Sequence, residues 1–211
     1  MRVLVYIPRH GKTTDSDKHI FRGNRDSKLN EEGFRDAFEL REFFRDLAFG
    51  DIYASDRTRS IQTGHIIGEP HDKVPYVTKA LEPWRIGELT GKDKLEYGPV
   101  MQHYIDNPEE EIPGGESRND FEHNRIYPLI VEAIEMGLDG PPPIIVGHSS
   151  IIHAAVNLIN GDGSKTLAVK PGGIIIIYLE DGEIKIKAVF KKGKEDSSYA
   201  VADKKHQSPS S

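Results

Sequence analysis

Two short segments place a histidine beside residues that can hold a negatively charged group. Arg9-His10-Gly11 follows an apolar run at residues 3–7, and Gly147-His148-Ser149 follows a second apolar run at residues 144–146. An arginine can bind a phosphate or a carboxylate through two parallel hydrogen bonds, and an imidazole can act as a nucleophile, a base or a metal ligand. Together the two segments predict an anion pocket that contains a reactive imidazole.

For this pocket to form, the two apolar runs must be neighbouring strands of one sheet. Each run is short and rich in β-branched residues, which is typical of a buried strand. A third short run, at residues 52–54, leads within a turn to Arg57 and Arg59. Because α/β proteins place ligand sites at the carboxyl edge of the sheet, we expect both histidines and several arginines to converge there.

Gly11-Lys12-Thr13 has the form of the last part of the phosphate-binding loop GxxxxGK[ST]. That motif requires a glycine five residues before Gly11, and the sequence has Tyr6 at that position. Without this glycine the backbone amides cannot surround a polyphosphate. The sequence therefore excludes a nucleotide-triphosphatase loop here.

Alternating strands and helices predict a three-layer α/β domain over residues 1–190, with a mostly parallel central sheet, helices on both faces and an antiparallel edge hairpin. The predicted helices are 31–48, a helix capped by Ser55-Asp56 and ending near 67, 94–106, 117–136 with Gly137 as its stop, and 151–159. Asp181-Gly182 predicts the hairpin turn. Residues 80–117 are expected to be mostly loop, with Trp84 either in the core or in the pocket wall. Residues 191–211 are polar, and we expect them to be disordered.

The composition restricts the partners and the kinds of site. The 211 residues carry a formal net charge of −6, which argues against nucleic-acid binding. Cysteine is absent, and no two of the nine histidines have the i,i+4 spacing of a helical zinc site. No apolar run approaches the roughly 20 residues that cross a bilayer, and Met1-Arg2 leads into too few apolar residues for a signal peptide. We therefore expect a cytoplasmic protein without membrane or nucleic-acid partners; the sequence does not indicate an oligomeric state.

Four segments stand in order along the chain: Arg9-His10-Gly11, residues 55–63, Gly114-Gly115-Glu116-Ser117 and Val146-Gly147-His148. In this order they resemble the signature of the histidine phosphatase superfamily, in the Arg-His-Gly branch with the phosphoglycerate-mutase-like fold. The resemblance implies a phosphomonoesterase that releases phosphate from a small phosphorylated metabolite through a phosphohistidine intermediate. Two alternatives stay open, a phosphoglycerate-type mutase and a weakly active phosphate-binding or regulatory domain.

The resemblance also implies a role for each matched residue. His10 would be the nucleophile that becomes phosphohistidine, and Arg9, Arg59 and His148 would bind the phosphoryl group and stabilise its transition state. No metal and no cofactor are implied, which agrees with the need of phosphoryl transfer for positioning and fixed positive charge. One departure lies beside the nucleophile, where Lys12 stands in place of the glutamate that family members usually carry.

A second departure concerns the acid that protonates the leaving group. The family usually places a glutamate four residues before a glycine that corresponds to Gly87, and this chain has Pro83 there. Glu82, one residue away, is the first choice for the catalytic acid. Glu116 in the matched Gly-Gly-Glu-Ser segment is the alternative, and Glu88 is a weaker third candidate.

Overall fold

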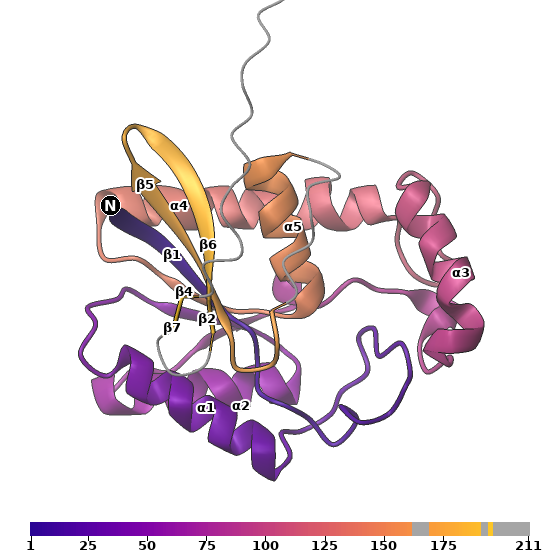
Figure 1. Cartoon of the computed structure of the whole chain (residues 1–211), viewed down its shortest axis with the longest axis horizontal. Coiled ribbons are helices and arrows are strands. Elements are labelled where there is room, and N and C mark those ends of the chain that lie inside the picture. Colours follow the sequence, from indigo (N-terminus) through magenta and orange to yellow (C-terminus); the bar gives the residue numbers. More distant parts are fainter. Residues whose placement is uncertain (162–168, 191–193, 196–211) are drawn as a thin grey trace, which may run out of the picture.

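A mixed β-sheet runs through the middle of the molecule (Figure 1). The computed structural model describes residues 1–161, 169–190 and 194–195, and within them the sheet has seven strands in the order β3-β2-β4-β1-β5-β6-β7. The strands are β1 (Arg2–Pro8), β2 (Ile52–Ser55), β3 (Tyr76–Thr78), β4 (Ile144–Val146), β5 (Ile174–Glu180), β6 (Glu183–Phe190) and β7 (Lys194–Glu195). Strands β3, β2, β4 and β1 pair in parallel, whereas β5, β6 and β7 extend the sheet beyond β1 through antiparallel pairs.

Helices cover both faces of this sheet. α1 (Glu31–Phe44) and α2 (Thr58–Gly68) lie on one face, and α4 (Tyr127–Asp139) and α5 (Ser149–Asn160) lie on the other (Figure 1). α3 (Lys94–Asp106) stands to one side of the sheet. The shorter segments are the 3₁₀ turns η1 (Glu69–His71), η2 (Lys79–Leu81) and η3 (Gly87–Leu89), and the π-helix η4 (Asp120–Ile126). The predicted three-layer α/β architecture is confirmed.

The sheet is held between two apolar layers. Tyr6 of β1 packs with Phe44 on the side of α1 and α2, and Leu4 packs with Ile130 on the side of α4 and α5. Residues 4–7 of β1 are all buried, as expected for a strand covered on both faces. The end of β1 is therefore held rigidly, and the loop that follows it starts from a fixed point.

Two glycines bring α1 into direct contact with the loop that follows β1. A Cβ atom on Gly33 would lie 1.8 Å from the carbonyl oxygen of Lys12, and a Cβ atom on Gly11 would lie 2.3 Å from the carbonyl oxygen of Gly33. Distances this short exclude any side chain at either position. The backbone of Lys12 is also held by Asp36 of α1, whose Oδ2 accepts its N–H at 3.1 Å. Helix α1 therefore fixes the backbone directly after His10.

Two predicted helices differ from the observed ones. The helix predicted to reach residue 48 ends at Phe44, and the helix predicted at 117–136 is divided into η4 and α4. Pro128 stands in the first turn of α4, where its missing N–H is tolerated and where it cannot continue a regular helix from η4. Gly137 lies inside α4 rather than ending it, because a Cβ atom there would lie 2.0 Å from the carbonyl oxygen of Leu4. The glycine allows close packing of α4 on β1.

The start of α2 differs as well. Its N-cap residue is Arg57 rather than Ser55 or Asp56, and the side chain of Arg57 accepts no hydrogen bond from the backbone of the first turn. Asp26, distant in sequence, accepts the N–H of Thr58 at 2.8 Å instead.

The predicted disordered tail, residues 191–211, lies outside the described residues except for β7, which pairs with β6. In the described ranges no helix is long and apolar enough to cross a membrane.

Candidate active site

The carboxyl ends of β1 and β4 bring His10 and His148 together. The two strands are parallel neighbours, and a bridge between Arg9 and Gly147 continues their pairing beyond the strand ends. The N–H of His10 donates to the carbonyl oxygen of Gly147 at 3.2 Å. The two imidazole rings then lie with centroids 5.1 Å apart at an angle of 60°. The two segments singled out in the sequence therefore form one site.

The hydrogen bonds of His10 define which ring nitrogen can react. Nδ1 lies 2.7 Å from the carbonyl oxygen of Gly11, and because a carbonyl can only accept, Nδ1 carries the hydrogen. Nε2 keeps its lone pair and accepts a hydrogen bond from Nε of Arg59 at 3.2 Å. Burial, and then the charges of Arg59 and Arg9, lower the pKa of His10 well below its ordinary value near 6.5. His10 is therefore a neutral imidazole whose Nε2 faces the guanidinium of Arg59. The free lone pair on Nε2 allows this nitrogen to act as a nucleophile.

Arg59 and Arg9 supply positive charge on two sides of this ring. Arg59 lies in the first turn of α2, is 2% exposed, and is held by the carbonyl oxygen of Arg25 at 2.8 Å. Arg9 follows β1, and its Nη1 donates to the carbonyl oxygen of Val169 at 2.6 Å. Burial, followed by the charge of Arg22, lowers the pKa of each to about 10, so both stay charged at neutral pH. The site therefore presents fixed cations to an anion.

His148 is held from the neighbouring strand. Its Nε2 lies 2.7 Å from the hydroxyl of Ser55 at the end of β2, and within the described residues its buried Nδ1 has no hydrogen-bond partner. Burial, then the charges of Arg59 and nearby His10, lower the pKa of His148 well below its ordinary value. Because buried polar atoms in proteins normally have a hydrogen-bond partner, this nitrogen can form a hydrogen bond with an atom of a bound ligand.

Comparison with known families identifies the superfamily of the chain. The family model of the histidine phosphatase superfamily (branch 1) matches residues 5–192. The chain belongs to this superfamily. The match contains each segment on which the resemblance was based, so the family expected from the sequence is confirmed.

Several named proteins are similar to this chain over most of its length. "Putative phosphoserine phosphatase 2" from Hydrogenobacter thermophilus is 28% identical over 184 residues, covering 83% of this chain and 89% of that protein. "Probable phosphoglycerate mutase GpmB" from Klebsiella pneumoniae is 29% identical over 162 residues, covering 74% of each chain. The crystal structure of phosphoglycerate mutase from Bacillus anthracis superposes with a TM-score of 0.70 at 23% identity, covering 89% of this chain and 93% of that one. The fold is thus that of the phosphoglycerate-mutase-like histidine phosphatases.

Glu82, the first-choice acid, lies beside the arginines of the second signature segment. Its Oε1 accepts from Nη2 of Arg57 at 2.6 Å, and the same nitrogen donates to Asp56 at 2.8 Å. The hydrogen bond from Arg57, and to a smaller extent a contact with Glu82, lower the pKa of Asp56. Glu82 therefore lies beside the second signature segment and contacts its first arginine.

Glu116, the alternative acid, occupies a different setting. One carboxylate oxygen accepts from the backbone N–H of Arg85 at 3.0 Å and also binds Nη2 of Arg125, while the other binds Nη2 of Arg85 at 2.8 Å. Burial would raise the pKa of Glu116, but the hydrogen bonds from both arginines outweigh it and hold the pKa below its ordinary value. An ionised carboxylate cannot donate a proton. Glu88, the third candidate, is exposed.

The side chain of Lys12, the departure beside the nucleophile, contacts helix α1. Its ammonium forms an ion pair with Glu32 of α1 at 2.7 Å, so its charge is neutralised there. Sequence reasoning missed three residues near the site. Ser55 lies inside the second segment that carried the resemblance but had no assigned role. Arg22 lies between the first and second segments and Lys94 at the start of a predicted helix, and neither had an assigned role.

Proposed function

We propose that the protein is a phosphomonoesterase that acts on a small phosphorylated metabolite through phosphohistidine at His10. The observation that carries the proposal is the orientation of His10, whose Nδ1 hydrogen binds Gly11 while Nε2 faces Nε of Arg59 at 3.2 Å. A phosphoryl group bound by Arg59 lies next to the lone pair that attacks it. Superfamily membership supports this role.

The reaction follows from these positions in two steps. In the first, Nε2 of His10 forms a bond to phosphorus while the bond from phosphorus to the leaving oxygen breaks, and Glu82 gives its proton to that oxygen. In the second, water attacks the phosphohistidine, the carboxylate of Glu82 takes a proton from the water, and inorganic phosphate leaves with His10 restored. Each step conserves charge and protons without any further reactant.

Stabilisation of the transition state comes from groups that are already in place. Phosphoryl transfer spreads negative charge over the oxygens of the transferred group, and preorganised cations lower the barrier because they need no rearrangement. Arg9 and Arg59 are held by backbone carbonyl oxygens, and His148 keeps Nδ1 available for a phosphoryl oxygen. No metal ion and no cofactor enters this mechanism.

The test is to trap the covalent intermediate. A ³²P-labelled phosphomonoester mixed with the protein and quenched in alkali should leave a label that is stable to alkali and lost in acid, as a phosphoramidate is. His10→Ala should abolish the label, whereas His65→Ala, which changes an exposed histidine of α2, should retain it. A label that persists in His10→Ala would falsify the assignment. Absence of any label and any phosphate release would favour a phosphate-binding domain.

A phosphoglycerate-type mutase is the second candidate, because relatives named as mutases match 74% of the chain. A mutase returns the phosphoryl group to a second hydroxyl, so its phosphoenzyme must be protected from water. Incubation with 3-phosphoglycerate separates the two functions: release of inorganic phosphate identifies the phosphatase, and formation of 2-phosphoglycerate stimulated by 2,3-bisphosphoglycerate identifies the mutase.

A further inference from the structure

Arg125 binds the backbone of the segment that carries Glu82. Its Nη1 donates to the carbonyl oxygen of Glu82 itself at 2.7 Å and to that of Ala80 at 3.2 Å, and its Nη2 donates to that of Pro83 at 3.4 Å. Because η2 ends at Leu81, the backbone that follows is not held by a helix or a strand. One guanidinium therefore holds the backbone on both sides of the candidate acid.

The guanidinium of Arg125 is itself held in one place. It binds the carboxylate of Glu116, and its Cζ lies 4.8 Å from the centroid of the Phe121 ring. The side chain of Arg125 is 16% exposed and that of Glu116 is 6% exposed, so water competes weakly for these contacts. Hydrogen bonds that involve a charged group are also stronger than neutral ones. Arg125 is therefore a rigid support for residues 80–83.

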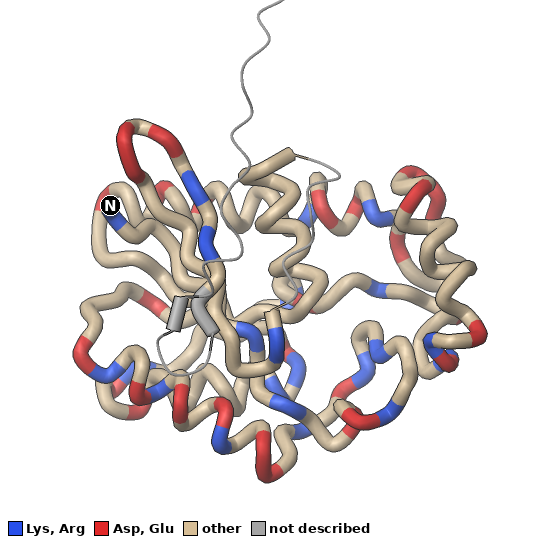
Figure 2. Tube along the Cα trace, viewed as in Figure 1, with Lys and Arg blue, Asp and Glu red and all other residues tan. Residues whose placement is uncertain are grey.

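A π-helix brings Arg125 to this position. Arg125 is in the last turn of η4, and Asp120 and Glu122 are in its first turn (Figure 2). α4 follows directly from η4, starting at Tyr127. A π-helix holds more residues per turn than an α-helix, so it rotates the side chains that follow; such segments are rare and frequent at functional sites. The π-helix therefore sets the direction of the Arg125 side chain.

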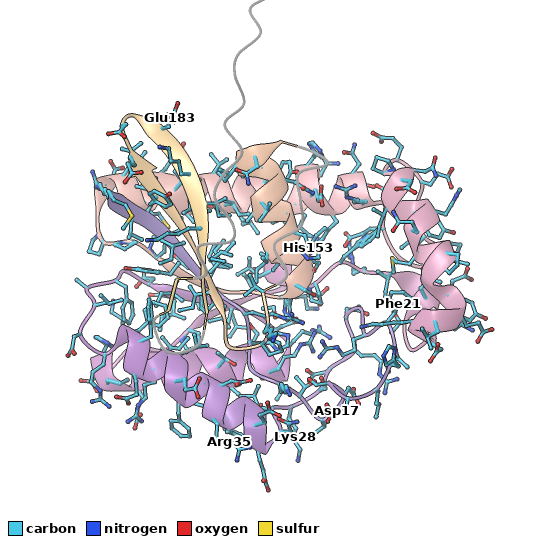
Figure 3. All side chains as sticks on the ribbon, in the orientation of Figure 1. Asp17, Phe21, Lys28, Arg35, His153 and Glu183 are labelled. Atoms are coloured by element: carbon cyan, nitrogen blue, oxygen red, sulfur yellow. The ribbon has the colours of Figure 1, made fainter. Side chains whose placement is uncertain are left out.

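The next part of the segment is tied to α5. The backbone N–H of Trp84 donates to Oγ of Ser150 at 3.2 Å, and its indole N–H donates to the carbonyl oxygen of Glu116 at 3.2 Å. His153, one turn further along α5, lines the same cavity as Trp84 (Figure 3). Because the N-cap residue of α5 is His148, this end of the segment is attached to a helix that begins in the active site.

The carboxylate of Glu82 is held from the opposite side. It forms an ion pair at 2.6 Å with Arg57, the N-cap residue of α2. Arg59, whose Nε faces Nε2 of His10, lies in the first turn of that helix. A catalytic acid must lie within hydrogen-bond reach of the leaving oxygen, and a misplacement of about 1 Å can cost about 10²-fold in rate. The backbone position of residues 80–83 therefore decides whether Glu82 can deliver its proton.

We propose that Arg125 is a positioning residue that acts through Glu82, because it fixes the backbone of residues 80–83 so that the Glu82 carboxyl reaches the leaving oxygen. This inference rests on the function proposed above and adds a residue of the π-helix to the groups that control protonation of the leaving group. Arg125 transfers no proton itself, because a guanidinium stays protonated in proteins. Its loss should slow substrates that need the proton and spare those that do not.

The experiment compares two substrates, p-nitrophenyl phosphate and propyl phosphate, because only the alkyl leaving group depends strongly on protonation. Arg125→Met keeps the length of the side chain and removes every donor. It should raise the ratio of kcat/KM for the aryl ester to that for the alkyl ester by about 10–100-fold, since a displaced acid loses part of its effect. Arg125→Lys, which keeps a charge for Glu116 but lacks the fork of donors, should show a smaller rise and remains measurable if Arg125→Met does not fold.

Arg118→Met is the matched control. Arg118 lies just before the same π-helix, forms an ion pair with the buried Glu122, and has a side chain that is 20% exposed. It also donates to the carbonyl oxygen of Ile105, which belongs to α3 rather than to residues 80–83. Arg118→Met should therefore lose similar stability and keep the wild-type ratio. A ratio that rises equally in both methionine variants, or in neither, overturns the proposal.

The double variant of Arg125→Met and Glu82→Gln tests whether Arg125 acts through Glu82. If it does, the double variant should have the same ratio as Glu82→Gln alone, because two residues of one unit have effects that do not add. Additive effects on the ratio overturn the proposal. So does an unchanged ratio in Glu82→Gln, although a label on His10 would then still support the phosphatase.

Hydrogen exchange separates this proposal from the function on which it rests, because it needs no substrate. In the peptide of residues 79–87, the N–H of Glu82 donates to the carbonyl oxygen of Lys79, and the N–H of Arg85 donates to Glu116. Mass spectrometry should show faster exchange of this peptide in Arg125→Met and unchanged exchange in Arg118→Met. That result supports the positioning role even if the wild type releases no phosphate. Unchanged exchange in Arg125→Met overturns it, and the labelling of His10 still decides the phosphatase function.

Discussion

The hydroxyl of Ser55 lies 2.7 Å from Nε2 of His148 and links the ends of β2 and β4. The backbone N–H of Arg57 donates to the same oxygen at 3.4 Å, so Ser55 connects the ring to the start of α2 as well. Nδ1 of His148 is buried without a hydrogen-bond partner in the described residues. Ser55 therefore holds Nε2 and leaves Nδ1 as the ring nitrogen that can contact a phosphoryl oxygen.

Replacing this hydroxyl should weaken catalysis without unfolding the protein. We expect Ser55→Ala to lower kcat by about 2–10-fold, since one neutral hydrogen bond contributes about 0.5–1.5 kcal/mol. Ser55→Thr keeps a hydroxyl and should recover most of the rate. Steady-state kinetics of both variants check the prediction, and a threonine variant as slow as the alanine variant would assign the effect to packing.

The link between Ser55 and His148 also marks the limit of what the sequence could predict. Apolar runs such as residues 144–146 predict strands because the pattern is local, and a histidine at the end of each of two strands predicts a shared edge. The two residues of this hydrogen bond are 93 positions apart, and their contact depends on the register of β2 against β4. The contact of Arg125 with the carbonyl oxygen of Glu82 depends in the same way on where η4 lies relative to a distant segment. Contacts of this kind have no signal in a single sequence.

The buried histidines should make stability depend on pH. His10 and His148 stay neutral in the folded protein because burial and nearby arginines lower their pKa well below the ordinary value. In the unfolded chain each takes up a proton near pH 6.5, so the folded state loses stability as the pH falls below about 6.5 and until the folded pKa is reached. Urea midpoints should therefore be lower at pH 5.5 than at pH 7.5.

The contribution of these two residues can be isolated by substitution. His10→Asn and His148→Asn should each reduce the difference between the two midpoints, while His65→Asn on the exposed face of α2 should leave it unchanged. If the double variant at positions 10 and 148 shows the full wild-type difference, other groups cause the pH dependence.

Activity should not depend on a metal ion. Within the described residues no group of three or more histidine, aspartate or glutamate side chains could hold one, and arginines already provide the positive charge that phosphoryl transfer requires. Incubation with EDTA should leave kcat unchanged, and orthovanadate, which resembles the trigonal-bipyramidal transition state, should inhibit competitively. Loss of activity in EDTA with recovery on adding Mg²⁺ would contradict this prediction.

The contact between α1 and the loop after His10 should be sensitive to one methyl group. In Gly33→Ala the new Cβ atom would lie 1.8 Å from the carbonyl oxygen of Lys12, so helix and loop must move apart. We expect a loss of about 1–3 kcal/mol in the free energy of unfolding, with a lower kcat because the backbone beside His10 shifts. Gly98→Ala in α3 is the matched control, since nothing lies within 4 Å of its Cβ position. That variant should be more stable by about 0.5–1 kcal/mol, and similar effects of both substitutions would show that the contact is not tight.

The proton for the leaving group should come from Glu82. Glu82 lies one residue from the position where the family carries its acid and forms an ion pair with Arg57, whereas the hydrogen bonds of Arg85 and Arg125 hold the pKa of Glu116 below its ordinary value. Loss of a general acid costs about 10²–10⁴-fold in rate. Because aryl phosphates have leaving groups that barely need protonation, Glu82→Gln should be slow on alkyl phosphates and close to wild type on p-nitrophenyl phosphate.

The matched variants at the other two carboxyl groups complete this test. Glu116→Gln removes the charge that pairs two arginines and should destabilise the fold by about 1–3 kcal/mol, with no difference between alkyl and aryl substrates per folded molecule. Glu88→Gln changes an exposed side chain and should resemble wild type on both. The ratio of kcat/KM for p-nitrophenyl phosphate to that for an alkyl phosphate is the deciding quantity, since it cancels any loss of folded protein. If this ratio rises in Glu116→Gln and not in Glu82→Gln, the acid is Glu116, and its two arginines must release it when substrate binds.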